Sequence, residues 1–221
     1  MTTRGRIVQA AIDTYGVLED LIAIGLSPHL RRRGYFLIHA FAAAYQGQGV
    51  LIVGGIGAGK TTTGMSLLNA GWQLLSNDSP ILTAEGQILR YPGVLAAYPQ
   101  TFARFAPTAH LAQTPISKTG RPKITLPAEA VWPDVWRDSA PVNLILFPQI
   151  ENRPAHQLER LPAAAALARL LPHAVEQWDR PLIPRHLSLL RALVEQAPAY
   201  VLHLSPDVLT IPPLLETTLT P

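Results

Sequence analysis

The amino-acid sequence predicts an α/β fold in which a mixed sheet is flanked by helices. Three observations predict it. Apolar residues recur at helical spacing in some segments and form short continuous runs, typical of buried strands, in others. A glycine-rich loop joins one of these runs to a helix, and a short hairpin pattern adds antiparallel pairing to the sheet. With 221 residues, 48% of them hydrophobic, and a net charge of +3, the chain is predicted to be folded rather than disordered.

The first half of the chain alternates between the two patterns. The spacing of apolar residues predicts an amphipathic helix over residues 7–24 and an apolar strand over residues 35–45. A second strand at residues 50–53 is wholly apolar, which suits the middle of a covered sheet. A helix follows over residues 60–70 and is closed by Gly71, the residue type that most often ends a helix.

The remaining elements are predicted from shorter signals. We expect a strand at residues 72–76 and a hairpin formed by residues 80–83 and 87–90 around the turn Ala84-Glu85-Gly86. Beyond residue 90 we expect a strand at 142–147, helices at 161–171 and 185–196, and a last strand at 199–204.

Residues 54–61 match G-x-x-x-x-G-K-[ST], the motif of a phosphate-binding loop, and they lie between an apolar strand and a helix as that motif requires. Backbone N–H groups of such a loop surround phosphate oxygens, and the helix N-terminus adds positive potential. Lys60 would neutralise the β and γ oxygens, and Thr61 would hold Mg²⁺. The expected ligands are therefore ATP and Mg²⁺. The alternative is a glycine-rich turn with a surface lysine.

Charge is almost absent from the segment around this motif. Between Gly34 and Ala84 the only charged residues are Lys60 and Asp78. Asp78 follows a predicted strand, so it can hold Mg²⁺ beside the phosphate loop or accept the proton of the nucleophile. Its alternative role is that of a turn residue, because its neighbours also favour turns.

Glycine and proline are unevenly distributed. Fourteen of the 15 glycines lie at or before Gly93, and nineteen of the 21 prolines lie after residue 90. We expect one domain over 1–221. Residues 1–34 would form an N-terminal helix and loop, 35–90 the nucleotide-binding core, and 91–221 a proline-rich covering region with helices and late strands.

The chain has only three lysines, and two of them, Lys118 and Lys123, flank Gly120. Residues 117–123 are either a basic loop that closes over phosphates or an ordinary solvated turn. In the first case Arg121 is the residue best suited to clamp the γ-phosphate.

Several classes of function are not expected. The longest apolar run is far below the roughly 20 residues of a spanning helix, and the N-terminus lacks an export signal. We therefore expect a cytoplasmic protein without a membrane partner. The longest basic block, Arg31-Arg32-Arg33, is better explained as a solvated loop than as a nucleic-acid site. No cysteine is present, which excludes a disulfide scaffold, and the histidines show no metal-ligand spacing.

Four segments together resemble the catalytic domain of HPr kinase/phosphorylase, which shares its fold with phosphoenolpyruvate carboxykinase. They are Leu-Ile-His-Ala at 37–40, Gly-Val-Leu-Ile-Val-Gly at 49–54, Gly-Ala-Gly-Lys-Thr at 57–61 and Ala-Gly-Trp-Gln-Leu-Leu-Ser-Asn-Asp at 70–78. The resemblance covers residues 36–90. The later alanine- and leucine-rich helices, followed by the strand at 200–204, are similar to compact bacterial relatives without a separate N-terminal domain.

The resemblance implies roles for individual residues. His39, which composition alone would place in the core, matches a histidine near the transferred phosphate. Lys60 and Thr61 match the phosphate-binding lysine and the Mg²⁺-holding hydroxyl. Asn77 and Asp78 align with two adjacent aspartates, one a base towards the acceptor serine and the other a partner of the metal. Thr62 replaces the family's glutamate, and Asn77 replaces its first aspartate.

These observations predict a P-loop serine kinase of the HPr kinase type that uses ATP and Mg²⁺. Its catalytic residues would be Asp78, His39 and Lys60, and its metal ligands Thr61 and Asp78. Its nucleotide-binding residues would be Gly54, Gly57, Ala58, Gly59, Lys60, Thr61, Thr62 and Arg121. Because an amide cannot accept a proton, Asp78 or solvent would take the proton of the acceptor.

The acceptor would be a serine-type hydroxyl of a protein, peptide or small molecule, and the departures from the family favour a serine other than that of HPr without deciding whether HPr is a substrate. The resemblance also implies a homo-oligomer as one possible state, because the family tends to assemble. Two alternatives stay open. One is a nucleotide-binding regulatory module without phosphotransfer, and the other is a phosphohydrolase or phosphorylase acting on phosphoserine.

Overall fold

The computed structural model describes residues 2, 4–12, 17–113, 123–151, 153–174 and 179–220. The α-helices are α1 (Gln9–Ile12), α2 (Val17–Arg32), α3 (Lys60–Asn69), α4 (Pro99–Phe102), α5 (Ala163–Ala174), α6 (Ile183–Gln196) and α7 (Ile211–Leu219). The strands are β1 (Tyr35–Leu37), β2 (Ala40–Tyr45), β3 (Gln48–Val53), β4 (Gln73–Ser76), β5 (Ile81–Thr83), β6 (Gln87–Leu89), β7 (Leu95–Ala97), β8 (Ile124–Leu126), β9 (Ser139–Ile150), β10 (Gln157–Leu161) and β11 (Ala199–Leu204). Short 3₁₀ helices cover Ala106–Gln113, Ala128–Ala130, Arg180–Leu182 and Val208–Thr210.

The central sheet is mixed, as the sequence predicts. β3 pairs antiparallel with β2 and parallel with β9, and β9 pairs parallel with β11. β4 extends the sheet beyond β2, and β10 extends it beyond β11, both in antiparallel pairing. The carboxyl ends of β3, β9 and β11 therefore meet at one edge, which is where a parallel sheet usually places its ligand.

A second ladder branches from the same sheet through β9. The first residues of β9 pair with β6, which pairs with β5, and β5 pairs with β1. The antiparallel pairing of β5 with β6 confirms the predicted hairpin. β9 thus belongs to both ladders, since its later residues pair with β3 and β11.

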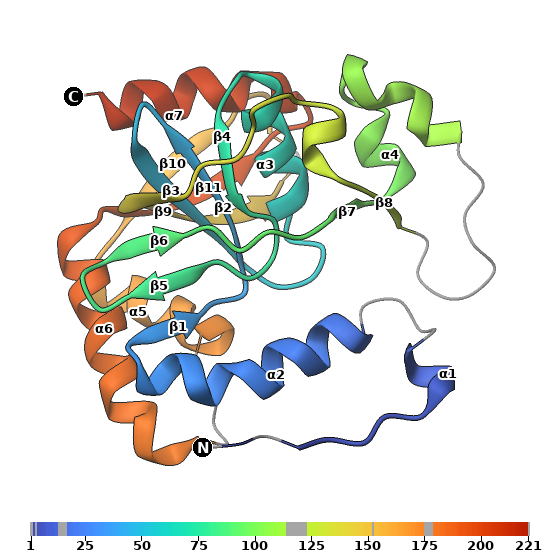
Figure 1. The fold of residues 1–221 in the computed structure, drawn as a ribbon. Helices are drawn as coiled ribbons and strands as arrows, with labels where there is room; N and C mark the ends of the chain where they lie inside the picture. The colour runs from blue at the N-terminus through green and yellow to red at the C-terminus, as the bar shows by residue number, and fades with distance from the viewer. Residues whose placement is uncertain are drawn as a thin grey trace.

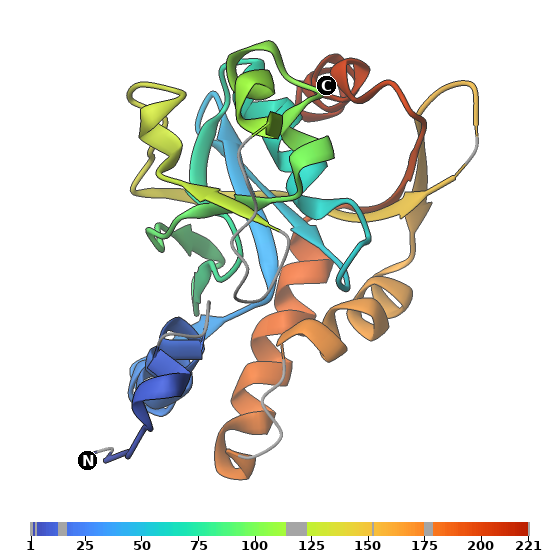
Figure 2. The same ribbon diagram turned by 90° about the vertical axis from the view of Figure 1, so that its right-hand side faces the viewer.

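Both faces of the central sheet are covered by helices, and Figures 1 and 2 show α3 and α7 on one side and α5 and α6 on the other. Along β3 the residues alternate between the two cores. Val50 and Ile52 lie in the core with α3 and α7, whereas Leu51 and Val53 lie in the core with α5 and α6. All four are fully buried, which explains why this strand is wholly apolar.

Helix α3 packs closely against β2 because it contains a glycine at the contact. A Cβ atom at Gly64 would lie 2.3 Å from the ring of Phe41, closer than any real side-chain contact. Thr63, on the same side of the helix, is completely buried. This close packing fixes the N-terminal end of α3 relative to the sheet.

Two predicted elements in the N-terminal part differ from the structure. The helix predicted over residues 7–24 corresponds to α1 and α2, and α2 continues through Pro28 to Arg32. The strand predicted over residues 35–45 is split into β1 and β2, which belong to different ladders. At the split, the N–H groups of Ile38 and His39 bond to the carbonyls of Pro80 and His173 instead of a neighbouring strand.

The second half of the chain supplies part of the central sheet as well as its cover. The strand predicted at residues 142–147 is β9, and it extends through two prolines, Pro141 and Pro148. A proline cannot donate a ladder hydrogen bond. Pro141 lies before the first pair with β3, Gly49 with Val142, and Pro148 lies beyond the last, Ile52 with Leu146. The helices predicted in this half are confirmed as α5 and α6, and the last strand as β11.

None of the helices in the described part of the chain is long and apolar enough to cross a membrane.

Candidate active site

The glycine-rich segment leaves the carboxyl end of β3 and enters α3, whose first residue is Lys60. Gly57 and Gly59 adopt positive φ angles of 81° and 99°, a region that favours glycine. Gly59 is constrained a second time, because a Cβ atom there would lie 2.8 Å from Leu204 on β11. The loop is therefore held against the carboxyl edge of the sheet, with the N–H groups at the start of α3 at its end.

The side chain of Lys60 lies back over this loop. Its Nζ donates hydrogen bonds to the carbonyl oxygens of Gly54 at 2.7 Å and Gly55 at 3.1 Å, and lies 3.2 Å from His39 Nε2. Burial lowers the pKa of Lys60, and nearby Lys123 lowers it further, whereas the carboxylate of Asp78 acts in the opposite direction. Within the described residues, the ammonium therefore has carbonyls and an imidazole as close partners, and no carboxylate at hydrogen-bond distance.

His39 lies between Lys60 and Asp78. Its Nδ1 is 3.3 Å from Asp78 Oδ1, and its backbone N–H donates to the carbonyl of His173 at 2.8 Å. An ammonium can only donate, so Nε2 accepts from Lys60, and the ring proton is assigned to Nδ1, where it faces the carboxylate. Three residues that are far apart in the sequence thus form one chain of polar contacts beside the glycine-rich loop, with a hydrogen bond between Lys60 and His39 and an ion-pair contact between His39 and Asp78.

Pairing of β2 with β4 brings Asp78 to this position. The carbonyl of Asp78 accepts a hydrogen bond from the N–H of Ala40 at 3.1 Å, directly beside His39. The Asp78 carboxylate is 62% exposed, and of its two oxygens only Oδ1 is engaged by the described residues. Oδ2 is consequently accessible to a ligand.

Asn77 does not join this chain. Its Nδ2 donates to the carbonyl of Val94 at 3.3 Å, in the segment that leads into β7. A carboxylate at this position would face the carbonyl with no proton to donate, so the contact requires an amide. The structure thereby gives Asn77 a role in holding the Val94 segment.

The two threonines of α3 lie in different surroundings. Thr61 is half-buried in the first turn of the helix, immediately after Lys60. The hydroxyl of Thr62 lies 3.4 Å from that of Thr101 on α4. Thr62 therefore connects α3 to α4, and its predicted contact with a nucleotide stays a prediction.

The predicted basic loop is only partly described. Arg121, Lys118 and Gly120 lie outside the described residues, so their predicted contacts stay predictions. Lys123 is described, and its Nζ lies 5.5 Å from the centre of the Tyr98 ring. Its charge also contributes to the lowered pKa of Lys60, which places this end of the loop on the same side of the molecule as the site.

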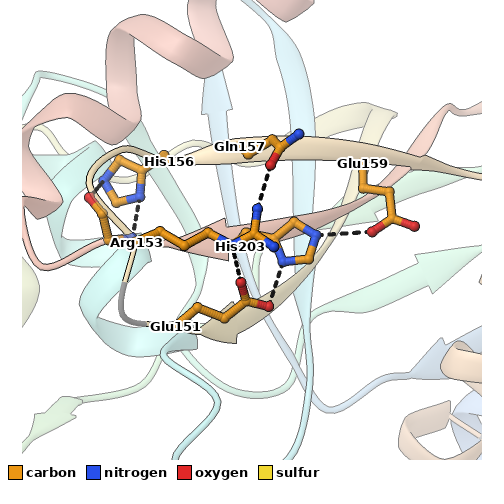
Figure 3. Close-up of polar contacts among 7 residues, drawn as sticks. Glu151, Arg153, His156, Gln157, Glu159 and His203 are labelled. Atoms are coloured by element: carbon orange, nitrogen blue, oxygen red, sulfur yellow. Dashed lines mark hydrogen bonds and ion pairs between the residues drawn. The ribbon is translucent and has the colours of Figure 1, made fainter.

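A second polar cluster lies at the carboxyl ends of β9 and β11 and is shown in Figure 3. His203 is nearly buried; its Nδ1 lies 2.7 Å from Glu151 and its Nε2 3.0 Å from Glu159. Arg153 contacts the other oxygen of Glu151. The hydrogen bond with His203 is the main reason why the pKa of Glu151 is lowered. An imidazolium can donate to both carboxylates at once, whereas a neutral ring can donate to only one.

This cluster is a neighbour of the glycine-rich loop. Ile150, just before Glu151, lies 3.6 Å from where a Cβ of Gly59 would be, and Leu204, just after His203, lies at 2.8 Å. The cluster could not be predicted from the sequence, because its members come from three separate segments: Glu151 follows β9, Glu159 lies in β10 and His203 in β11. The signal that could have identified it is the histidine in the otherwise apolar strand at 199–204.

No group of three or more His, Cys, Asp or Glu side chains suited to a metal ion occurs among the residues that the structure describes. Oxygen donors near the loop are the hydroxyl of Thr61 and the carboxylate of Asp78. Such a set suits an ion that arrives with a phosphate ligand rather than one held in a cage of protein groups.

The sequence matches no protein-family profile and no curated protein. Among solved structures, the fold is similar to that of HPr(Ser) kinase/phosphatase from Coxiella burnetii, with a TM-score of 0.41 and 12% sequence identity. The alignment covers 83% of this chain and 93% of the other. The similarity is a distant one in fold.

Proposed function

We propose that this protein is a kinase that transfers the γ-phosphate of ATP to a serine-type hydroxyl, with Mg²⁺ as its cofactor. The observation that carries the proposal is the chain of polar contacts from Asp78 through His39 to Lys60 beside a glycine-rich loop. A cation, a proton carrier and a carboxylate are the groups that phosphoryl transfer needs at one place.

The phosphates of ATP would bind to the loop between Gly54 and Lys60. N–H groups at the start of α3 favour an anion there. Lys60, now bonded to the loop's own carbonyls, would donate to phosphate oxygens instead. Negative charge beside it would also offset the cost of burying the ammonium, which is the main cause of its lowered pKa.

Thr61 and Asp78 are the residues that would hold Mg²⁺. A magnesium ion in such sites keeps several waters and takes one or two protein oxygens besides the phosphates. The Thr61 hydroxyl and the unengaged Oδ2 of Asp78 fit this donor set. When bound, the ion neutralises charge on the phosphate oxygens.

In the transfer, a bond forms between the acceptor oxygen and the γ-phosphorus, and the bond from that phosphorus to the bridging oxygen of ADP breaks. The proton of the acceptor goes to Asp78 or to solvent. Lys60 stabilises the charge on the transferred group, and His39 keeps both Asp78 and Lys60 in position through its two ring nitrogens.

One observation favours a second candidate, a nucleotide-binding regulatory module without transfer. The amide of Asn77 is committed to Val94, so only one carboxylate, that of Asp78, is available next to His39. Such a module would bind ATP without moving its phosphate.

A phosphotransfer assay with radiolabelled ATP and Mg²⁺ separates the two candidates. We expect Lys60→Ala to abolish transfer, because the phosphates lose their cation. Asp78→Asn should lower kcat at least about a hundredfold, the usual effect of removing a group that assists proton transfer.

The matched control for the second variant is Asp138→Asn. Asp138 is an exposed carboxylate paired with Arg90 at 3.6 Å, at the opposite end of β9 from the site. It should keep the wild-type rate. Equal rates in wild type, Lys60→Ala and Asp78→Asn would refute the kinase, and ATP binding without transfer to any hydroxyl would support the module. Release of phosphate from phosphoserine would support the reverse reaction instead.

A further inference from the structure

A pocket of about 290 Å³ opens beside His39, on the side of the molecule that carries α2. Its wall is formed by α2, the end of β1 and the C-terminal end of α5, which lie together in the lower part of Figure 1. Ile24 of α2 and His173 of α5 are among the lining residues, as is Ser79, which follows Asp78. The volume is at the lower end of the range for small-ligand sites, so the pocket suits a small group rather than a large molecule.

The lining is uncharged. None of the described residues that line the pocket is Asp, Glu, Lys or Arg, and most are apolar. Two of the lining residues, His39 and His173, carry an imidazole ring. The pKa of His173 is lowered by burial and then by the nearby His39 and Lys60, so its ring is neutral at pH 7. No charged residue in the lining would compensate a charged ligand for the hydration that it loses here.

The pocket and the candidate active site share His39. This residue lies in the pocket wall while its ring contacts both Lys60 and Asp78. Its position is fixed from the pocket side as well, since its N–H donates to the carbonyl of His173. A group bound in the pocket would therefore be adjacent to the residues that handle the phosphate.

We propose that this pocket binds the phosphate acceptor and selects a hydroxyl that is carried by an uncharged, apolar body. The inference rests on the proposed kinase function and names the acceptor's chemistry. The hydroxyl would point towards His39, and the apolar body would pack on Ile24 and its neighbours. Such a body can be a free alcohol or the residues that flank a serine in a peptide, and the experiment distinguishes the two sources.

Two exposed isoleucines of α2 provide a matched pair of variants. Ile24, which lines the pocket, is 56% exposed, and Ile22, which does not, is 49% exposed. Glutamate at either position is tolerated by the fold because both side chains already contact water. Only Ile24→Glu places a carboxylate in the pocket.

Binding is measured first, by isothermal titration of three serine peptides and one free alcohol. The peptides are identical except that the residues flanking serine are leucine, glutamate or lysine, and the alcohol is isoamyl alcohol. We expect the leucine peptide or the alcohol to bind, and the two charged peptides to bind at least about tenfold more weakly. Ile24→Glu should weaken binding of the uncharged peptide or alcohol by a similar factor, and Ile22→Glu should leave that binding unchanged.

Binding without ATP keeps the proposal testable even if the protein transfers no phosphate. Equal binding of charged and uncharged peptides would overturn it, as would equal effects of Ile24→Glu and Ile22→Glu or no binding of any uncharged probe. ATP binding is measured in parallel on wild type and Lys60→Ala. Absence of ATP binding or of phosphate transfer would refute the kinase proposal. The proposal for the pocket would be refuted only by the titrations with the peptides and the alcohol.

Discussion

His186 shows how much one buried side chain can contribute to the acid sensitivity of this protein. The residue lies on α6, is 1% exposed, and has its ring 4.5 Å from that of Phe36. Neither ring nitrogen has a hydrogen-bond partner among the described residues. Burial, with a smaller contribution from the charge of Arg31, lowers its pKa to about 4. The folded protein therefore holds this ring neutral at pH values where the unfolded chain would protonate it.

We expect the free energy of unfolding to fall as the pH drops from about 6.5 to about 4. In that window the unfolded chain binds a proton at His186 and the folded protein does not, so acid favours unfolding. The loss at the lower end amounts to about 3 kcal/mol. Urea unfolding of wild type and His186→Phe at pH 7 and pH 4.5 measures it, and the variant should lose this part of the pH dependence.

The control is His110→Phe, at an exposed histidine in the 3₁₀ helix Ala106–Gln113. It should leave the acid sensitivity as it is in wild type. If His186→Phe and wild type lose the same stability between the two pH values, the buried histidine is not the cause.

At the scale of elements, α2 is joined to the rest of the molecule by a buried ion pair. Arg31 and Asp179 have side chains only 1% and 5% exposed, with 4.0 Å between Nη1 and Oδ2. Arg32 adds two contacts to the same carboxylate, at 3.0 Å and 3.4 Å. This pair joins the C-terminal end of α2 to the segment that precedes α6, and so supports one wall of the pocket beside His39.

Asp179→Ala should destabilise the fold by about 3–5 kcal/mol, because it removes the carboxylate from a buried arginine. The matched control is Asp138→Ala, which removes an exposed ion pair with Arg90 and should cost about 1 kcal/mol or less. Chemical denaturation of both variants gives the two numbers. Equal costs would show that the buried pair contributes no more than a surface pair.

Elements with a strong local pattern could be predicted from the sequence. β3, α3 and the hairpin of β5 and β6 carry a continuous apolar run, a glycine motif and a turn, respectively, and all of them are present. β10 could not be predicted, because none of its residues is buried and, in the part of the chain that the structure describes, β11 is its one strand partner. The division of the predicted strand into β1 and β2 at residues 38–39 could not be predicted either. The sequence stays largely apolar there, although the two strands pair with different neighbours.

Only the part of the candidate site that lies in a local sequence motif could be predicted. The spacing of the motif predicts the loop and Lys60, because both are local. The contact between His39 and Asp78 depends on the pairing of β2 with β4, which no local pattern determines. The same holds for the hydrogen bond of Asn77 and for the cluster around His203, whose members meet only in the folded sheet.

At the scale of the whole molecule, stability should be greatest in the middle of the sheet. β3 is paired on both edges and buried on both faces, whereas the first part of α2 exposes several large apolar side chains, among them Leu18, Leu21 and Ile22. Local opening is easiest where few buried contacts must be broken.

Native-state hydrogen exchange tests this gradient. Amides of Val50, Leu51 and Ile52 should exchange only through global unfolding, with a free energy that matches the one from denaturation. Amides near the start of α2 should exchange at a clearly lower free energy. Slow exchange along the whole of α2 would contradict the expectation and would show that the helix is part of the cooperative core.

The late position of β9 in the sequence affects folding during synthesis, because β3 is synthesised long before its parallel neighbour. The glycine-rich loop and Lys60 leave the ribosome early, but the parallel neighbour of β3 begins only at Ser139, and its own neighbour β11 only at Ala199. Until then, one edge of β3 has no strand to pair with, and exposed apolar edges promote aggregation. We therefore expect the nascent chain to be most prone to aggregation before β9 has been synthesised.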